Sequence, residues 1–175
     1  MSGRSGRVSL GLRLLLTLVG FAVAGVVAGF VWEALWTAPG GVAIESQWYL
    51  DNEGVQDDFS GTGVYVLVGL VGGLALGVVS ALTARSNEVA TLAAVALGST
   101  AAAALMAVTG HALGPPDPRP LAEGEKDFTA IPADLRVVGR TPYAALPAGA
   151  LTGLAVCFVA LNGSSRSRLD GEPDG

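Results

Sequence analysis

Charged residues are scarce in this chain, and they are unevenly placed. Only 14% of the 175 residues are Asp, Glu, Lys or Arg, whereas a soluble globular domain carries about 25%. The charges gather in short segments, and the long stretches between them carry almost none. Because a hydrocarbon core disfavours each ionised side chain by several kcal/mol, this segregation indicates an integral membrane protein.

Residues that usually carry chemistry are also few. Cys157, the single cysteine, lies in an apolar run; it excludes an internal disulfide and is expected to act as a small hydrophobic residue. There is one histidine, and neither a metal-binding His/Glu cluster nor a Gly-x-Ser-x-Gly elbow occurs. The net charge of −5 argues against a nucleic-acid partner. We therefore predict a non-enzyme without a cofactor or a bound metal.

Against this background, four long apolar runs stand out. They cover residues 12–35, 64–82, 89–113 and 143–161. About 20 residues of helix span the roughly 30 Å of a hydrocarbon core, and the runs lack the period-two alternation of barrel strands. The first run is too long for a cleaved signal peptide and has no clear cleavage site. The sequence predicts an all-α membrane protein, a bundle of four transmembrane helices, with 64–82 and 89–113 forming a tight antiparallel hairpin.

The segments between the runs differ in character. The loop 37–63 has a strand-like stretch at 42–50, a turn-like Asp51-Asn52-Glu53-Gly54 and a candidate return strand from Val55. The loop 114–141 opens with a proline-rich stretch that favours extended backbone, and 134–138 is a candidate short strand. Together they predict a small β-cap. Residues 1–11 are expected to be a short N-terminal segment, and 163–175 a disordered tail.

Orientation follows from the basic residues, which concentrate in cytoplasmic segments of membrane proteins. With both termini inside, six basic residues lie in short inner segments: Arg4, Arg7, Arg13, Arg85, Arg166 and Arg168. The loop 37–63 contains five acids and no Lys or Arg. Tryptophan and tyrosine favour the membrane interface, and four of them fall at the outer ends of the runs: Trp32, Trp36, Tyr65 and Tyr143. We predict a multi-pass protein of the plasma membrane with cytoplasmic N- and C-termini and both loops outside.

Small residues recur at four-residue spacing in three of the runs. This spacing places them on one helix face, where another helix backbone can approach closely. The predicted packing positions are Gly25, Gly29, Gly69, Gly73, Gly77, Ala81, Gly149 and Gly153. Packing within one chain is the favoured interpretation, and homodimerisation is the alternative.

Glu33 and His111 are the ionisable residues nearest the outer ends of their runs. If they lie at similar depth they could pair, each favouring the charged form of the other, and form a proton-responsive or cation-binding outer vestibule. The alternative is that both reach separately to the headgroup layer. No charge occupies the centre of a run, which weakens the case for an ion-coupled transporter.

Three short segments carry a resemblance to known sequences. They are Gly110-His111-Ala112-Leu113-Gly114-Pro115, Asp58-Phe59-Ser60-Gly61-Thr62-Gly63, and Asp134-Leu135-Arg136-Val137-Val138-Gly139 leading to Pro147. The chain resembles a family of uncharacterised four-helix membrane proteins from actinobacteria. The resemblance implies the four-span topology and marks His111 with its Leu-Gly-Pro neighbours as the position to test, but it implies no activity.

Three hypotheses for function remain. The leading one is a non-enzymatic accessory or assembly subunit that contacts another membrane or envelope protein within the lipid bilayer, with homo-oligomers as a further option. The second is a small transporter or channel component gated at Glu33 and His111. The third and weakest is a membrane enzyme acting outside the cytoplasm.

Overall fold

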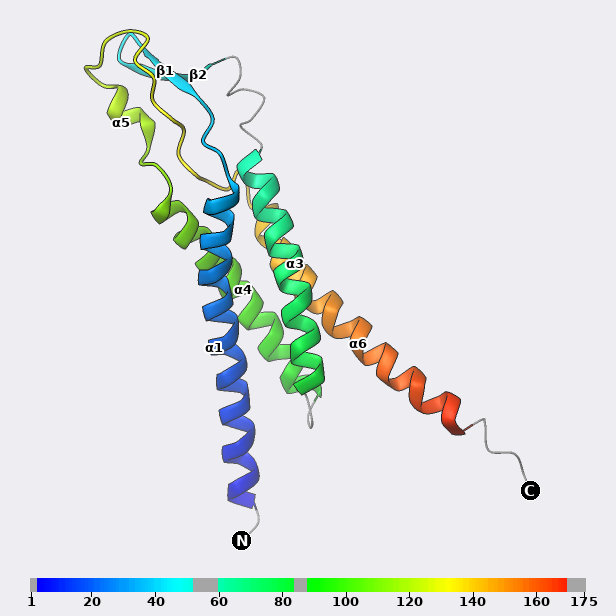
Figure 1. Cartoon of the computed structure of the whole chain (residues 1–175). Coiled ribbons are helices and arrows are strands. Elements are labelled where there is room, and N and C mark those ends of the chain that lie inside the picture. Colours follow the sequence, from blue (N-terminus) through cyan, green and yellow to red (C-terminus); the bar gives the residue numbers. More distant parts are fainter. Residues whose placement is uncertain (1–2, 52–59, 84–87, 170–175) are drawn as a thin grey trace.

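The protein consists of four long helices with a small two-stranded sheet at one end (Figure 1). The computed structural model describes residues 3–51, 60–83 and 88–169. The long helices are α1 (Gly3–Leu35), α3 (Ser60–Thr83), α4 (Glu88–Leu113) and α6 (Ala145–Leu169). The smaller elements are β1 (Gly41–Ile44), β2 (Gln47–Leu50), α5 (Pro118–Ala122) and the 3-10 turn η1 (Thr141–Ala144).

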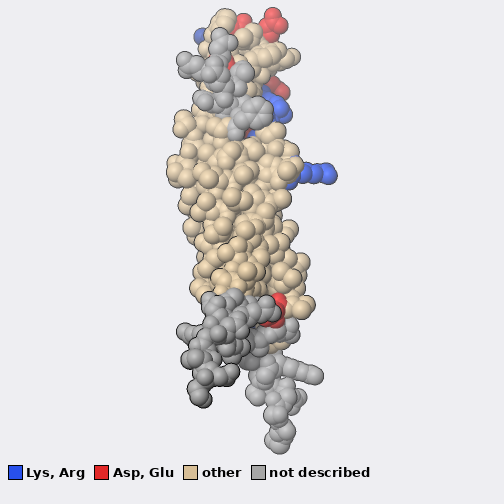
Figure 2. All heavy atoms as spheres, turned by 90° about the vertical axis from the view of Figure 1, so that its right-hand side faces the viewer, with Lys and Arg blue, Asp and Glu red and all other residues tan. Residues whose placement is uncertain are grey.

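All four predicted apolar runs are helices, each long and apolar enough to cross a membrane. Their outward surfaces carry large exposed hydrophobic side chains, such as Leu16, Val71, Leu97 and Val159. Figure 2 shows one face of the molecule, on which a broad belt without charge separates acidic and basic side chains at the cap end from an acidic group near the other end. An apolar belt of this kind is compatible with a multi-pass membrane protein, because lipid tails accept it and water does not.

The helices pack as two pairs of parallel partners, α1 with α4 and α3 with α6. In Figure 1, α1 and α4 run toward the sheet, whereas α3 and α6 run away from it, and α6 diverges from the other helices toward its far end. The predicted antiparallel arrangement of the second and third spans is confirmed, but the contact between them is small. Chain connection makes α3 and α4 antiparallel, but each packs most extensively on a helix that is remote in sequence.

β1 and β2 form an antiparallel hairpin within the stretch predicted to be a single strand. Gly41 pairs with Leu50 and Ile44 with Gln47, so the turn is Glu45–Ser46. Both turn residues have positive φ, 50° and 60°, as in the two-residue turns that match the twist of a hairpin. Of the predicted turn at Asp51 to Gly54, only Asp51 lies within the described residues, and the candidate return strand from Val55 lies outside them.

The second loop lies against β1 and completes a cap built from both loops. Ala43 donates its amide to Thr129, Phe128 donates to Ala43, and Ile131 donates to Gly41 at 2.8–3.0 Å. The Trp48 indole donates a 2.9 Å hydrogen bond to the Ile131 carbonyl. Ala43, Ala122 and Ile131 are buried together beneath Trp48. We call residues 37–51 and 114–140 the cap.

Three further predictions need correction. Residues 134–138 form no strand; the single bridge of this loop to β1 joins Val42 and Ala130. The proline-rich stretch includes helix α5, because Pro118 occupies the first turn, where no amide is needed, and Asp117 accepts a hydrogen bond from the Arg119 amide. α6 continues to Leu169 through much of the predicted tail, of which 170–175 lie outside the described residues, and α1 already begins at Gly3.

Candidate functional site at the capped end

An aromatic cluster joins the two helix pairs where they meet the cap. Trp32 of α1 and Tyr65 of α3 are both fully buried, with ring centroids 5.0 Å apart in an edge-to-face arrangement. Tyr143 of η1 lies 5.6 Å from Tyr65. Such pairs add about 0.5–1.5 kcal/mol beyond the burial of their area. Three elements that are distant in sequence are thereby fixed to one another.

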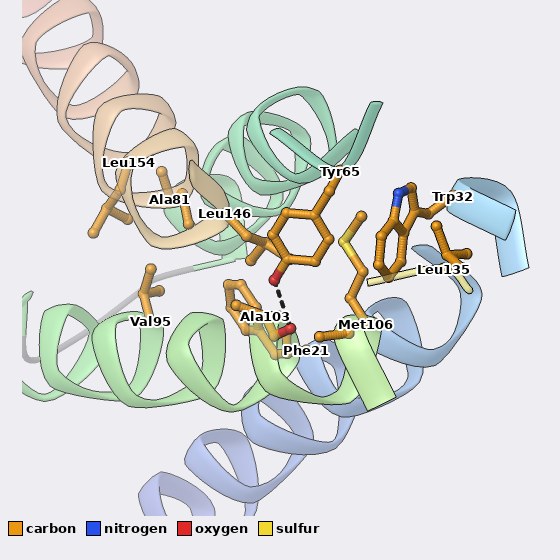
Figure 3. Close-up of a cluster of buried hydrophobic side chains, with 13 residues drawn as sticks. Phe21, Trp32, Tyr65, Ala81, Val95, Ala103, Met106, Leu135, Leu146 and Leu154 are labelled. Atoms are coloured by element: carbon orange, nitrogen blue, oxygen red, sulfur yellow. Dashed lines mark hydrogen bonds between the residues drawn. The ribbon is translucent and has the colours of Figure 1, made fainter. Parts of the chain in front are cut away.

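Each buried polar tip in this cluster has a partner. The Trp32 indole donates a 2.7 Å hydrogen bond to the Gly61 carbonyl at the start of α3. The Tyr65 hydroxyl donates a 2.7 Å bond to the Ala103 carbonyl of α4, as the dashed line in Figure 3 shows. Burying a polar group without a hydrogen-bond partner costs free energy. Each ring is therefore held in the one position where its polar tip reaches a backbone carbonyl.

The cap is fastened to the helices through the segment that follows its bridge to β1. Leu135 is completely buried in the main core, and in Figure 3 it lies beside Trp32. One ring nitrogen of His111, Nδ1, lies 2.8 Å from the Leu135 carbonyl and donates to it, because a carbonyl oxygen can only accept. The Val138 amide donates to the Thr62 hydroxyl at 3.1 Å. The cap therefore rests on α3 and α4 through defined contacts.

The structure does not bring Glu33 and His111 together as an ion pair. Among the described residues the one salt bridge joins Arg136 and Asp134, at 3.8 Å within the cap. His111 is exposed and engages the cap backbone, and Glu33 is half-buried near the end of α1. The predicted vestibule residues thus share the capped end of the molecule without contacting each other by a salt bridge.

The glycines singled out in the sequence lie at the two helix–helix contacts. A methyl group on Gly25 would come within 2.5 Å of the Ala102 carbonyl oxygen, and one on Gly29 within 2.8 Å of the Met106 carbonyl oxygen. Gly69, Gly73 and Gly77 of α3 face the backbone of α6, and Gly149 and Gly153 of α6 face that of α3. Ala81 is buried in the same core. Sequence reasoning missed Gly98 and Gly110 of α4, which receive the rings of Phe21 and Trp32. They lie three four-residue steps apart on one face of α4, with Ala102 and Met106 between them. The large side chain of Met106 interrupts the run of small residues that signals such a face.

The buried core between the helices is largely apolar. Of the described residues, only Ser80 and Ser99 are buried polar ones, and the Ser99 hydroxyl donates to Ala96 in its own helix. Close approach of backbones at the glycines leaves no room for side chains or water between paired helices. Among the residues that the structure describes, no group of three or more His, Cys, Asp or Glu side chains could hold a metal ion.

The cap, in contrast, presents side chains outward. Phe128 is 77% exposed and has a positive φ of 68°, a conformation that is unfavourable for an aromatic residue and is usually imposed by surrounding structure. Its amide donates to Ala43, and the neighbouring Asp127 carboxylate accepts from the Glu45 amide at 2.8 Å. Tyr49 of β2 is also exposed. The hydrogen bonds of the cap thus hold a phenyl ring in solvent.

Comparison with known proteins identifies no relative: no family model, no curated protein and no solved structure matches the chain.

Proposed function

We propose that this chain is a non-enzymatic multi-pass protein of the plasma membrane that acts by contact, as an accessory or assembly subunit of a cell-envelope system. In this proposal the cap faces away from the cytoplasm and both termini lie inside, as the basic residues Arg4, Arg7 and Arg13 favour. We further propose that the chain belongs to the family of uncharacterised actinobacterial membrane proteins that its sequence resembles.

The apolar character of the buried core is the observation that carries the proposal. A transporter needs polar groups or water along its path, and the described helices bury only Ser80 and Ser99. An enzyme needs convergent reactive groups in a cleft, and the capped end offers hydrogen bonds that are already used by the fold. At the capped end, a partner protein could therefore bind only to the outer surface of the cap.

Phe128 supports the cap as the contact surface. Exposed aromatic side chains are enriched at the centres of protein interfaces, and this ring is held outward by backbone hydrogen bonds rather than folded onto the cap. A partner that covers Phe128 and Tyr49 would remove apolar area from water without any change in the helices.

Site-specific photocrosslinking tests this proposal. A photoreactive phenylalanine analogue at position 128 is expected to yield one discrete adduct with another envelope protein in intact cells. The matched control carries the same probe at Val159, which is exposed to a similar degree on α6, and is expected to crosslink lipid. Adducts of the chain with itself alone, or the same products from both positions, would count against the proposal.

The rival hypothesis, a transporter or channel component gated at Glu33 and His111, has a separate test. Flux through vesicles containing the purified chain would have to change in Glu33→Ala and His111→Ala variants. We expect no flux in the original chain and none in either variant, because the described interior holds no continuous polar lining.

A further inference from the structure

A lateral groove lies at the end of the helices remote from the cap. Its volume is about 480 Å³, within the range of about 300–1,000 Å³ typical of sites for small molecules. It is lined by residues of α1, α3 and α4, whose ends remote from the cap lie in the lower part of Figure 1. All three helices are long and apolar enough to cross a membrane, so the groove opens toward the position of lipid tails.

The lining has an apolar deep part and a charged shallow part. Gly20, Phe21 and Leu76 line the part nearer the middle of the helices, and Arg13 is the single charged residue among the lining residues. The apolar span of α1 begins at Leu10, which places Arg13 one turn inside it, about 5 Å along the helix axis at 1.5 Å per residue. Arginine at this depth reaches the headgroup layer.

The Arg13 guanidinium is available to donate hydrogen bonds to a ligand in the groove. Its side chain makes no salt bridge or hydrogen bond with any residue that the structure describes, and it is exposed. Two nearby hydroxyls are already used within their own helices: Thr17 donates to the Arg13 carbonyl and Thr83 donates to Val79. An anion at the mouth of the groove would therefore be met by a planar cation that suits phosphate geometry.

We propose that this groove binds an anionic phospholipid, with an acyl chain along Gly20, Phe21 and Leu76 and the headgroup phosphate on Arg13. A single chain of methylene groups matches the apolar part, and a negative phosphate matches Arg13, the one cation among the described lining residues. The inference requires membrane insertion but not the contact function proposed for the cap, so either can fail alone.

Gly20 allows the apolar part to be tested without disturbing the helices. A side chain at Gly20 meets no atom within 4 Å, so Gly20→Leu fills the groove while leaving the packing intact. Gly72 of α3 is equally open but does not line the groove, which makes Gly72→Leu the matched control. For the charge, Arg13→Gln is compared with Arg7→Gln, which removes an identical charge from the same helix six residues earlier.

The experiment is native mass spectrometry of the full chain released from detergent after incubation with phosphatidylglycerol or phosphatidylcholine of identical acyl chains. We expect phosphatidylglycerol to be retained over phosphatidylcholine, and Arg13→Gln to weaken its retention about fivefold, the factor for one basic residue near an anionic lipid. Gly20→Leu is expected to reduce retention as well, while Gly72→Leu and Arg7→Gln leave it unchanged.

Three results would overturn the proposal. Equal retention of the two lipids would show that the negative headgroup plays no part in binding. Equal losses of phosphatidylglycerol retention in Arg13→Gln and Arg7→Gln would show that only the general positive charge of this end matters. A dimer of the chain that disappears in Gly20→Leu would mean that a second copy occupies the groove instead. The same spectra report the number of copies, so each result is read from one preparation.

Discussion

The hydroxyl of Tyr65 on α3 donates a 2.7 Å hydrogen bond to the backbone carbonyl of Ala103 on α4. Both residues are buried, and the bond links one helix pair to the other. Because α3 packs mainly on α6 and α4 mainly on α1, few other contacts join these two helices. The two pairs also meet where α4 contacts α6 and where α1 contacts α3. At the capped end the aromatic cluster adds buried hydrogen bonds to these contacts.

Removing this hydroxyl should weaken the association of the pairs. We expect Tyr65→Phe to lower the free energy of unfolding by about 1 kcal/mol, the usual net value of one hydrogen bond in water and in membranes. Unfolding by sodium dodecyl sulfate in mixed micelles measures it. Tyr49→Phe is the matched control, because the Tyr49 hydroxyl bonds Gln47 at the exposed surface of the cap; an equal loss in both variants would show that the buried bond has no special role.

Substitutions at the α3–α6 contact should separate two kinds of glycine. A methyl group on Gly77 would meet the Ala150 carbonyl of α6, whereas one on Gly72 meets no atom within 4 Å. We expect Gly77→Ala to destabilise the protein by about 1–3 kcal/mol, the usual cost of overpacking. Gly72→Ala should be neutral or stabilising by up to about 1 kcal/mol, because alanine favours helix. Similar midpoints of unfolding for the two variants would contradict the close packing of α3 on α6.

The cap should loosen locally when its tryptophan bond is removed. Trp48→Phe loses the 2.9 Å hydrogen bond to Ile131. Loss of about 1 kcal/mol in local stability corresponds to about fivefold faster exchange of the amides that pair with the first loop. These are the amides of Phe128, Ile131 and Ala133, and hydrogen–deuterium exchange measures them.

Trp36→Phe supplies the comparison for the cap. Trp36 is half-buried, and its indole makes no hydrogen bond with any residue in the described ranges. Faster exchange in both tryptophan variants would indicate a general effect of losing an indole ring rather than the loss of one bond.

The helices were predictable from the sequence because their cause is local. A run of about 20 apolar residues must form a helix in hydrocarbon whatever surrounds it, and the predicted end of the first span at residue 35 agrees with the end of α1 at Leu35. The glycine faces were equally visible, since four-residue spacing is a property of the helix itself. Their partners were not, because which two faces meet depends on contacts such as Gly98 with Phe21 that join distant residues.

The cap shows the same limit in its turns. Glu45 and Ser46 are unusual residues for positive φ, and the Glu45 amide bonds Asp127, which lies 82 residues later in the chain. Local turn preferences therefore predicted one continuous strand over 42–50 and missed the turn within it. At the candidate site, the sequence placed Glu33 and His111 at one end of the molecule, but it could not foresee that His111 engages Leu135, because that contact exists only once the second loop has folded back onto α4.

The side of the membrane on which each segment lies tests the central claim most directly. Single cysteines are introduced into a Cys157→Ala chain at Lys126 in the cap, at Ser5 near the start of α1 and at Ser167 near the end of α6, and intact cells are treated with a membrane-impermeant maleimide. Reaction at position 126 alone, with positions 5 and 167 reacting only after permeabilisation, is the expected result. Labelling of either terminal position in intact cells, or protection of position 126, would contradict a four-span protein whose cap faces outward.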